Sequence, residues 1–251
     1  MLTSARIPDN HPRAKSLLER AKLVEGLRKG LVVPEGLIAH GRGEAFDYMI
    51  GEKTEGFARR AIRAAAAALL MAKNPVISVN GNVAALSPEK VVELAKAVEG
   101  LIEVNLFYRT PQRESTIARV LKENGAVEVL GAGKDASARI PELMSERRKV
   151  DPRGVLVADV VFVPLEDGDR TEALRKMGKT VIALDLNPMS RTSIAASITI
   201  VDNAVRAMPL LVDEAKKLKH SRNLRRIFDG FDNGKNLQEV MMHIGRRLAD
   251  V

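Results

Sequence analysis

The sequence predicts an α/β protein with a Rossmann-like three-layer fold, in which helices cover both faces of a mostly parallel sheet, plus an N-terminal helical segment. Short runs of β-branched and aliphatic residues alternate with stretches of helical periodicity, which is the pattern of βαβ units. The apolar runs are nearly continuous, as in parallel strands that are buried on both faces. Right-handed crossovers between such strands bring their carboxyl ends to one edge of the sheet.

Length and composition are those of a globular protein with a full core. Of the 251 residues, 45% are hydrophobic and 29% are charged. We expect residues 1–73 to form an N-terminal helical segment packed on a nucleotide- and substrate-binding core of residues 74–251. No apolar run approaches the roughly 18 residues of a membrane span, and residues 1–10 do not resemble a signal peptide. A cytoplasmic protein without a membrane partner is therefore expected.

Residue counts limit the kinds of site. The absence of cysteine excludes disulfides, thiolate catalysis and cysteine-ligated zinc, and four scattered histidines disfavour a histidine-based metal site. A net charge of +8 favours anionic partners. With six Phe, two Tyr and no Trp, few side chains can stack on single-stranded nucleic acid. Small phosphorylated ligands fit better, so we expect no nucleic-acid partner.

The first candidate site follows the first helix. An amphipathic helix is expected from about His11, with Gly30 just beyond its end. Residues 36–48 are then expected to form a loop, because closely spaced glycines permit positive φ angles and a near approach of the backbone to a ligand. A plain surface loop is the alternative, but three ionisable types between glycines favour a function. The candidate catalytic residues are His40, Arg42 and Glu44.

A long helix is expected next, over about residues 55–73, with Thr54 as its N-cap. Its run of alanines, residues 64–68, suits close packing against another helix or a dimer seam. Beyond it, strands and helices alternate. Strands are expected at residues 75–79, 102–107, 127–130, 159–164, 180–184 and 197–201. Helices are expected from a Ser87 cap and Pro88, up to Asn124, up to Met177, and at residues 204–219 and 237–248.

Polar clusters follow nearly every predicted strand, so they should converge around a single cavity at one edge of the sheet. Asn80 and Asn82 flank a glycine and can hydrogen-bond a ligand, although they also suit a turn. Arg109 and Arg113 flank a helix start that favours an anion, although either can pair with Glu114. The candidate substrate-binding residues are Asn80, Gly81, Asn82, Arg109, Arg113 and Lys134.

The stretch of residues 180–209 is the strongest nucleotide-binding candidate. Two short apolar runs end at clusters of Asp and Asn, which offer acceptors, and Arg191 with its neighbours offers donors and a positive charge. The acidic residues 166–170 can bind Mg²⁺ through hard oxygens, but we prefer a loop in which Asp169 caps the next helix. No Ser-His-Asp pattern or paired-carboxylate spacing supports a hydrolase.

Several long blocks of this sequence resemble the archaeal phosphopantothenate synthetases, which are 4-phosphopantoate:β-alanine ligases of coenzyme A biosynthesis. The resemblance spans nearly the whole chain. The blocks are His11-Pro12-Arg13 through Arg20, Gly36 through Tyr48, Asn80-Gly81-Asn82, Pro164 through Leu174, Asp185 through Thr192, and Val201-Asp202-Asn203.

The resemblance implies a homodimer with a Rossmann-like core that condenses 4-phosphopantoate with β-alanine and converts ATP to AMP and diphosphate. The metal ligands remain open, but Mg²⁺ is expected with ATP. The residues expected to bind ATP are Arg20, Arg42, Asp185, Leu186, Asn187, Arg191, Thr192, Asp202, Asn203 and Ala204.

A carboxylate needs a leaving group before an amine can displace it, so we expect an acyl-adenylate intermediate. His40 or Glu44 would then accept the amine proton. Two alternatives were weighed. A nicotinamide dehydrogenase is disfavoured because no Gly-x-Gly-x-x-Gly follows the first strand. A nucleic-acid-binding module would use the basic residues 216–226, which more simply form a solvated helix end.

Overall fold

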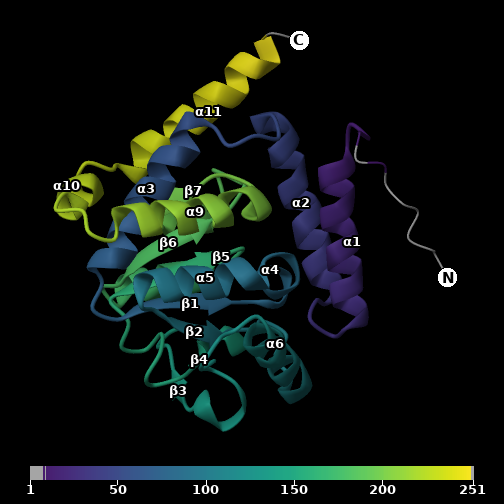
Figure 1. The fold of residues 1–251 in the computed structure, drawn as a ribbon, viewed down its shortest axis with the longest axis vertical. Coiled ribbons are helices and arrows are strands. Elements are labelled where there is room, and N and C mark those ends of the chain that lie inside the picture. The colour runs from purple at the N-terminus through teal and green to yellow at the C-terminus, as the bar shows by residue number, and fades with distance from the viewer. Residues whose placement is uncertain (1–7, 9, 250–251) are drawn as a thin grey trace.

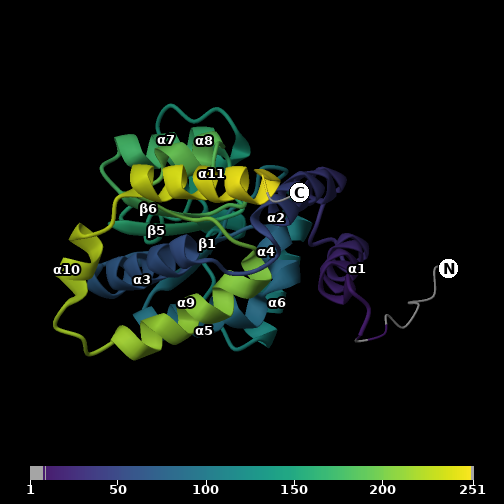
Figure 2. The same ribbon diagram turned by 90° about the horizontal axis from the view of Figure 1, so that it is seen from above.

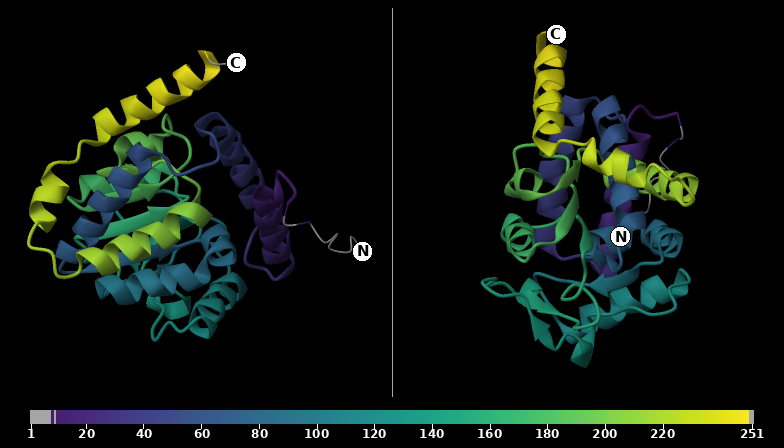
Figure 3. Two further views of the ribbon diagram at one scale, coloured as in Figure 1. Left: turned by 45° about the horizontal axis from the view of Figure 1, so that its top comes forward. Right: turned by 90° about the vertical axis from the view of Figure 1, so that its left-hand side faces the viewer.

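The computed structural model describes Pro8 and residues 10–249. The prediction that residues 1–10 are not a signal peptide concerns mostly residues outside this range. A five-stranded parallel sheet forms the centre, in the order β2-β1-β5-β6-β7 (Figure 1). Its strands are β1 (Pro75–Val79), β2 (Leu101–Val104), β5 (Val160–Pro164), β6 (Thr180–Leu184) and β7 (Ile198–Ile200). A short antiparallel pair, β3 (Ala138–Arg139) and β4 (Lys149–Val150), lies beyond β2 (Figure 3).

The helices confirm the predicted alternation. They are α1 (Ala14–Arg28), α2 (Pro34–Ile50), α3 (Gly56–Met71), α4 (Gly81–Leu86), α5 (Pro88–Val98), α6 (Pro111–Glu123), α7 (Gly168–Lys176), α8 (Arg191–Ala195), α9 (Ala204–Leu218), α10 (Leu224–Asp229) and α11 (Asn233–Ala249). Ser87 and Asp167 stand at N-cap positions without a side-chain cap bond, and Asp169 lies inside α7, so the predicted Asp169 cap is wrong.

The sheet separates two helical layers, which confirms the three-layer fold. Figure 2 shows α3, α5 and α9 on one side and α7, α8 and α11 on the other. Side chains of alternate strand residues point to opposite faces of the sheet and pack into two separate apolar clusters. Ile77 and Phe162 pack with the first layer, whereas Val76 and Val161 pack with α7 and the β3–β4 region. A third cluster, around Ile50, joins α2, α3 and α11.

Two of the predicted strands differ most from the expected bounds, while those predicted at 159–164 and 197–201 are shorter by one and two residues. The strand predicted at 102–107 ends at Val104, and the run at 127–130 forms only a bridge between Glu103 and Leu130. Leu130 donates to Ile102 and accepts from Val104, and then the chain turns away at Gly131, whose φ is +75°. The pairing stops there because only one residue is aligned before the turn.

The glycine-rich segment of residues 36–48 is helical, so the predicted loop is wrong. Pro34 occupies the first turn of α2, where a missing N–H costs nothing, and Gly51 ends the helix with φ +106°. No glycine within α2 has a positive φ, and Gly36 instead allows close packing against Asn82, which follows β1. A Cβ at Gly36 would lie 2.5 Å from Oδ1 of Asn82.

The alanine-rich helix α3 is a core element rather than a dimer seam. Residues 64–68 are at most 3% exposed and α3 packs against α9, α10 and β7. Thr54 does not cap α3, because its hydroxyl donates to Oδ2 of Asp202 (2.6 Å) while Glu55 holds the N-cap position. A division of the chain at residue 73 stays a prediction.

The face of the sheet toward α7 carries a buried polar network. Arg170 is fully buried, pairs with Glu166 and donates to Oγ of Ser78 (3.0 Å). Glu103 accepts from the backbone N–H groups of Asp151 (3.2 Å) and Val155 (2.6 Å). Burial raises the pKa of Glu103 from 4.5 to about 7, against the opposing effects of the Val155 hydrogen bond and the Arg170 charge.

Glu103→Gln should reduce the pH dependence of stability. The folded protein holds a proton on Glu103 between 4.5 and about 7, where the unfolded chain has released it, so the free energy of unfolding falls as pH rises through this window. Between about pH 5 and about pH 8 the wild type should lose roughly 2–3 kcal/mol more than the variant. Urea unfolding at both pH values measures this, and equal losses would contradict it.

Candidate active site

The helix α2 lies across the carboxyl ends of the strands (Figure 1). Gly36 lies against Asn82 just after β1, and a Cβ at Gly43 would touch Cδ1 of Leu186, just after β6, at 3.7 Å. Asp47 is bound by Asn203 and Arg206, which begin α9 after β7. Residues 36, 43 and 47, which are spaced by seven and four residues and so share one face of α2, therefore meet the ends of three strands.

The spacing of these contacts follows from the geometry of the two elements. Seven helical residues rise about 10 Å, which matches two strand spacings of about 4.8 Å each. Since β5 lies between β1 and β6, the turn of α2 between the Gly36 and Gly43 contacts, which carries His40, corresponds to the position of β5 in the strand order. The strand order changes direction between β1 and β5, which is where ligands bind in open α/β sheets.

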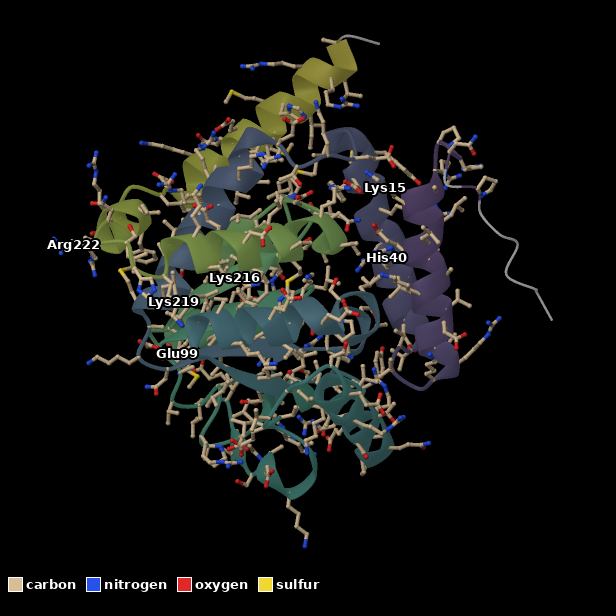
Figure 4. The ribbon with its side chains drawn as sticks, in the orientation of Figure 1. Lys15, His40, Glu99, Lys216, Lys219 and Arg222 are labelled. Atoms are coloured by element: carbon tan, nitrogen blue, oxygen red, sulfur yellow. The ribbon has the colours of Figure 1, made fainter. Side chains whose placement is uncertain are left out.

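His40 and Glu44 lie beside a groove between α1 and α2, with a volume of about 520 Å³ (Figure 4 labels His40). Arg20 from α1 pairs with Glu44 through Nε and Nη2, the closest contact being 2.8 Å, and Tyr48 donates to Glu44 at 2.9 Å. Burial acts to raise the pKa of Glu44, but these hydrogen bonds outweigh it and lower the pKa. Burial lowers the pKa of His40, which favours its neutral form.

The loop after β6 is built by its own side chains. Asp185 accepts from the N–H of Asn187 (2.9 Å) and the hydroxyl of Ser190 (2.5 Å), and Oδ1 of Asn187 accepts from Met189 (2.9 Å). Burial raises the pKa of Asp185, and the charge of Arg42 opposes this. The Nδ2 group of Asn187 has no partner in the part of the chain that the structure describes. These hydrogen bonds fix the shape of residues 185–190, called here the Asp185 cradle, and Arg42 of α2 lies near it.

The next predicted nucleotide residues hold α7 and α8 together. The hydroxyl of Thr192 donates to the carbonyl of Glu166 (2.9 Å), which links the loops after β6 and β5. Arg191 forms an exposed pair with Glu172 (2.8 Å), a type of contact that contributes little to stability. Its guanidinium is therefore available to an anionic ligand at small cost.

Asp202 and Asn203 form a buried lock between the N-terminal helices and α9. Arg206 pairs with Asp47 (2.5 Å) and Asp202 (2.7 Å), while Nδ2 of Asn203 donates to Glu19 of α1 (2.8 Å). Burial raises the pKa values of Glu19 and Asp202. The side chains of Asp202 and Asn203 therefore already have hydrogen-bond or ion-pair partners within the protein. The N–H of Ala204 has no partner among the described residues and can face a ligand.

The two asparagines after β1 are engaged within the protein. Oδ1 of Asn80 accepts from Asn82 and Val83 at the start of α4, and its Nδ2 donates to the carbonyls of Pro164 (2.9 Å) and Leu165 (3.0 Å). Asn80 therefore ties β1 to β5 across the switch point. Asn82 donates to the carbonyl of Gly36 (2.8 Å) and holds the start of α2. Neither side chain serves a turn, because Asn80 is the N-cap of α4 and Asn82 lies inside that helix.

Arg109 and Arg113 differ in their surroundings. Arg109 forms a buried pair with Glu114 (2.8 Å) and donates to the carbonyl of Gly131, which matches the predicted alternative. Arg113 donates to the carbonyl of Leu31 (2.9 Å), and its guanidinium lies against Gly81, where a Cβ would be 2.9 Å from Nη2. Arg113 therefore stays at the sheet edge beside β1.

Lys134 does not join these residues. It lies in a second cavity of about 340 Å³, together with Asp135, Asp151 and Arg153 near the β3–β4 pair. The cavity of Lys134 and the groove of His40 and Glu44 have no residue in common, so Lys134 does not line that groove. The expectation that all the predicted residues share one cavity stays a prediction.

One charged residue at this edge was missed from sequence. Arg147, in the turn before β4, is buried and pairs with Glu166 (2.8 Å) and Asp167 (2.5 Å) at the end of β5. It stands in a run of charged residues, which resembles a solvated surface and gives no signal of burial.

Among the described residues, no group of three or more His, Asp or Glu side chains could hold a metal ion alone. This holds also for the acidic residues of the stretch 166–170.

The basic region around α9 and α10 lies away from this edge. Figure 4 shows Lys216, Lys219 and Arg222 on the opposite side from His40. Lys216 pairs with Glu93 (3.3 Å) and Lys219 with Glu99 (3.1 Å), as expected of a solvated helix end.

No helix in the described part of the chain is long and apolar enough to cross a membrane.

Comparisons with known proteins are consistent over most of the chain. Residues 57–247 match the family model described as phosphopantothenate/pantothenate synthetase. Three curated relatives are named 4-phosphopantoate–β-alanine ligase. They come from Thermococcus onnurineus (55% identity; 97% of this chain and 94% of the relative), Thermococcus kodakarensis (56%; 97% and 94%) and Methanosarcina mazei (52%; 96% and 95%).

Two glycines of α2 provide a matched test of its seating. Gly36→Ala places a Cβ 2.5 Å from Oδ1 of Asn82, whereas a Cβ at Gly41 meets nothing within 4 Å. Gly41→Ala should gain up to about 1 kcal/mol from helix propensity. Gly36→Ala should be about 1–3 kcal/mol less stable than Gly41→Ala, because Asn82 must move and lose its bond to Gly36. Denaturant unfolding compares them, and equal stabilities would show that α2 does not depend on this contact.

Proposed function

This chain belongs to the phosphopantothenate/pantothenate synthetase family, and from that premise we propose that it is a 4-phosphopantoate–β-alanine ligase. It joins the two acids as 4′-phosphopantothenate, in coenzyme A biosynthesis, and converts ATP to AMP and diphosphate. One observation supports this most directly. The helix α2 spans the strand ends from Asn82, beside the basic residues after β1 and β2, to the Asp185 cradle after β6.

The two halves of this edge suit the two large substrates. ATP fits the β6–β7 half, where Arg42, Arg191 and the N–H of Ala204 can meet phosphates and the Asp185–Asn187 turn can meet polar groups of the nucleoside. The phosphorylated acid fits the β1–β2 half, beside Arg113. The reacting carboxylate would then lie near the end of β5, under the turn of α2 that carries His40.

Activation comes first. A carboxylate oxygen of 4-phosphopantoate attacks the α-phosphorus of ATP, and a C–O–P bond forms as diphosphate leaves. Arg42 and Arg191 at the nucleotide half would stabilise the charge that develops on the phosphoryl oxygens. Arg20 is less available than expected, since it is paired with Glu44 by Nε and Nη2.

Condensation follows when the amine of β-alanine attacks the acyl carbon and AMP leaves. The amine must lose a proton, and of the two candidate bases His40 is the better. Burial lowers the pKa of His40, so its imidazole is neutral and has a free lone pair. Glu44 has a lowered pKa and is occupied by Arg20 and Tyr48, which makes it a poor base.

Mg²⁺ fits this site as a companion of ATP. Magnesium is commonly held by substrate phosphates, water and one or two carboxylates, so a cage of three protein carboxylates is not needed. Asp185 is the carboxylate at the nucleotide half that could take part, directly or through water. Bound Mg²⁺ would neutralise part of the phosphate charge.

A homodimer is part of the proposal, from the family resemblance. The alanines of α3 are used inside the protomer, so another surface must serve. The outer faces of α1 and α2 expose Leu18, Val24 and Ile38 beside the groove, and these are candidates for contact with a second copy.

The reaction itself can be tested by its products. Purified protein with ATP, 4-phosphopantoate and β-alanine should release AMP only when all three are present. Oxygen-18 placed in the 4-phosphopantoate carboxylate should be recovered in AMP, because one carboxylate oxygen stays with the α-phosphorus. ADP as product, or oxygen-18 in orthophosphate, would instead indicate an acyl-phosphate route.

His40→Gln should separate the two half-reactions. Loss of a general base should lower AMP formation with all three substrates by about 100-fold or more. Exchange of labelled diphosphate into ATP, with 4-phosphopantoate but without β-alanine, should stay within about threefold of the wild type because activation does not use this base. His220→Gln, at the exposed end of α9, is the control and should leave both rates unchanged. Equal losses in both half-reactions would assign His40 a structural role.

A further inference from the structure

Several arginines, Arg109 and Arg148 among them, have a buried Nε donor that the protein does not use, and two of these arginines, Arg113 and Arg147, lie at the ends of β1 and β2. Arg113 begins α6 beside Gly81 at the end of β1, and Nη1 of Arg147 donates to the carbonyl of Asn105 (3.3 Å) at the end of β2. The Nε atoms of both arginines are buried and have no hydrogen-bond partner among the described residues. Buried donors without partners are costly, so an unfilled role for these groups is indicated.

Arg147 pairs with two carboxylates, Glu166 and Asp167, which differ in burial and in their other contacts. Oε1 of Glu166 lies 2.8 Å from Nη1, and the other oxygen of Glu166 pairs with the fully buried Arg170. Asp167 lies 2.5 Å from Nε of Arg147, yet neither of these two atoms makes a hydrogen bond, because the contact is poorly aligned. The side chain of Asp167 is 37% exposed, so solvent reaches this pair. Asp167 is therefore the partner of Arg147 that a ligand can replace.

The two arginines lie over neighbouring strand ends: Arg147 contacts Asn105 after β2 and Glu166 after β5, and Arg113 lies beside Gly81 after β1, which is the strand between them. Burial, and next the positive charge of Arg147, lower the pKa of Arg113. The carbonyl of Leu31 accepts from Arg113 without neutralising its charge. A dianion that reached both guanidinium groups would relieve this repulsion and supply acceptors for their free N–H groups. Without such a ligand, the pair would serve only to tie β2, β5 and α6 together.

We propose that Arg147 and Arg113 bind the phosphate of the substrate acid, which takes the place of Asp167 beside Arg147. This inference rests on the proposed function and deepens it, since it names the groups that distinguish 4-phosphopantoate from pantoate. No covalent bond changes in this step. The description of the family covers both phosphopantothenate and pantothenate synthetases, so the phosphate contacts determine which acid is accepted.

Glu166 connects Arg147 and Arg113, together called the phosphate clamp, to the nucleotide half of the site. Its carboxylate holds Arg147 and Arg170, and its backbone carbonyl accepts from the hydroxyl of Thr192 in the predicted ATP-binding segment. The same residue therefore fixes the positions of both Arg147 and Thr192 relative to the end of β5. Glu166 acts as a positioning residue between the two substrates.

The test compares binding and kinetics for the phosphorylated and unphosphorylated acids. Calorimetry measures binding of 4-phosphopantoate and of pantoate, and steady-state AMP formation gives KM for each acid and for ATP. Arg147→Gln should weaken binding of 4-phosphopantoate and raise its KM by about 10- to 100-fold, the effect of one or two charged hydrogen bonds. Its KM for ATP and its binding of pantoate should stay within about twofold. Arg119→Gln, exposed on the same helix as Arg113, is the matched control.

Asp167→Asn tests the same idea in the opposite direction. It removes the exchangeable carboxylate and leaves Arg147 to bind anions, so inorganic phosphate should compete with 4-phosphopantoate several-fold more strongly than in the wild type. A merely structural pair would give weaker competition or none. This variant also keeps the proposal testable if Arg147→Gln fails to fold.

Each outcome has a distinct meaning. If Arg147→Gln changes the binding of pantoate and 4-phosphopantoate equally, or changes neither, the clamp is overturned while the ligase reaction stands. If the wild type binds 4-phosphopantoate in preference to pantoate but releases no AMP, the proposed reaction fails and the clamp stands. If the wild type shows no preference for the phosphorylated acid, the clamp is wrong whatever the activity.

Discussion

The seating of α2 across the strand ends is the constraint on which the rest of the structure depends. Gly36 at β1, Gly43 at β6 and Asp47 at β7 hold one helical face to three strands, because helix rise and strand spacing coincide over this distance. The turn of α2 that carries His40 falls between the contacts at Gly36 and Gly43, and His40 lines the groove toward α1. The contact at Gly36 requires a glycine, because a Cβ there would collide with Asn82.

Charge pairing holds this arrangement in place before any substrate binds. Arg206 joins Asp47 to Asp202, and Glu166 joins Arg147 to Arg170. Removing one partner of a buried pair costs about 3–5 kcal/mol, because it leaves an uncompensated charge. These networks keep the cationic groups fixed, as preorganised electrostatic stabilisation requires. Asp167 is the exception, since its contact with Arg147 is poorly aligned and partly exposed.

Much of the fold could be predicted from the sequence, but less of the site. Strands β1 and β6 were predicted at their observed bounds because they are buried apolar runs between clear breakers. The segment of α2 was taken for a loop, since its glycines suggest positive φ when its packing against Asn82 is unknown. The roles of Asn80 and Arg109 could not be decided either. The pairing of Arg109 with Glu114 was among the alternatives, but the other partners of both side chains are backbone carbonyls distant in the sequence, which carry no residue-type signal.

The sequence by itself determined the alternation of strands and helices, the edge to which the polar clusters are directed, and the family resemblance, because all three depend on local residue order. The tertiary structure alone decided which polar groups remain available to ligands. That depends on which donors and acceptors are used between distant segments, as when Asn203 binds Glu19 and Arg113 binds Leu31. Arg147 could not be recognised in advance for the same reason. Its burial and its carboxylate partners exist only once the turn before β4 is folded against the end of β5.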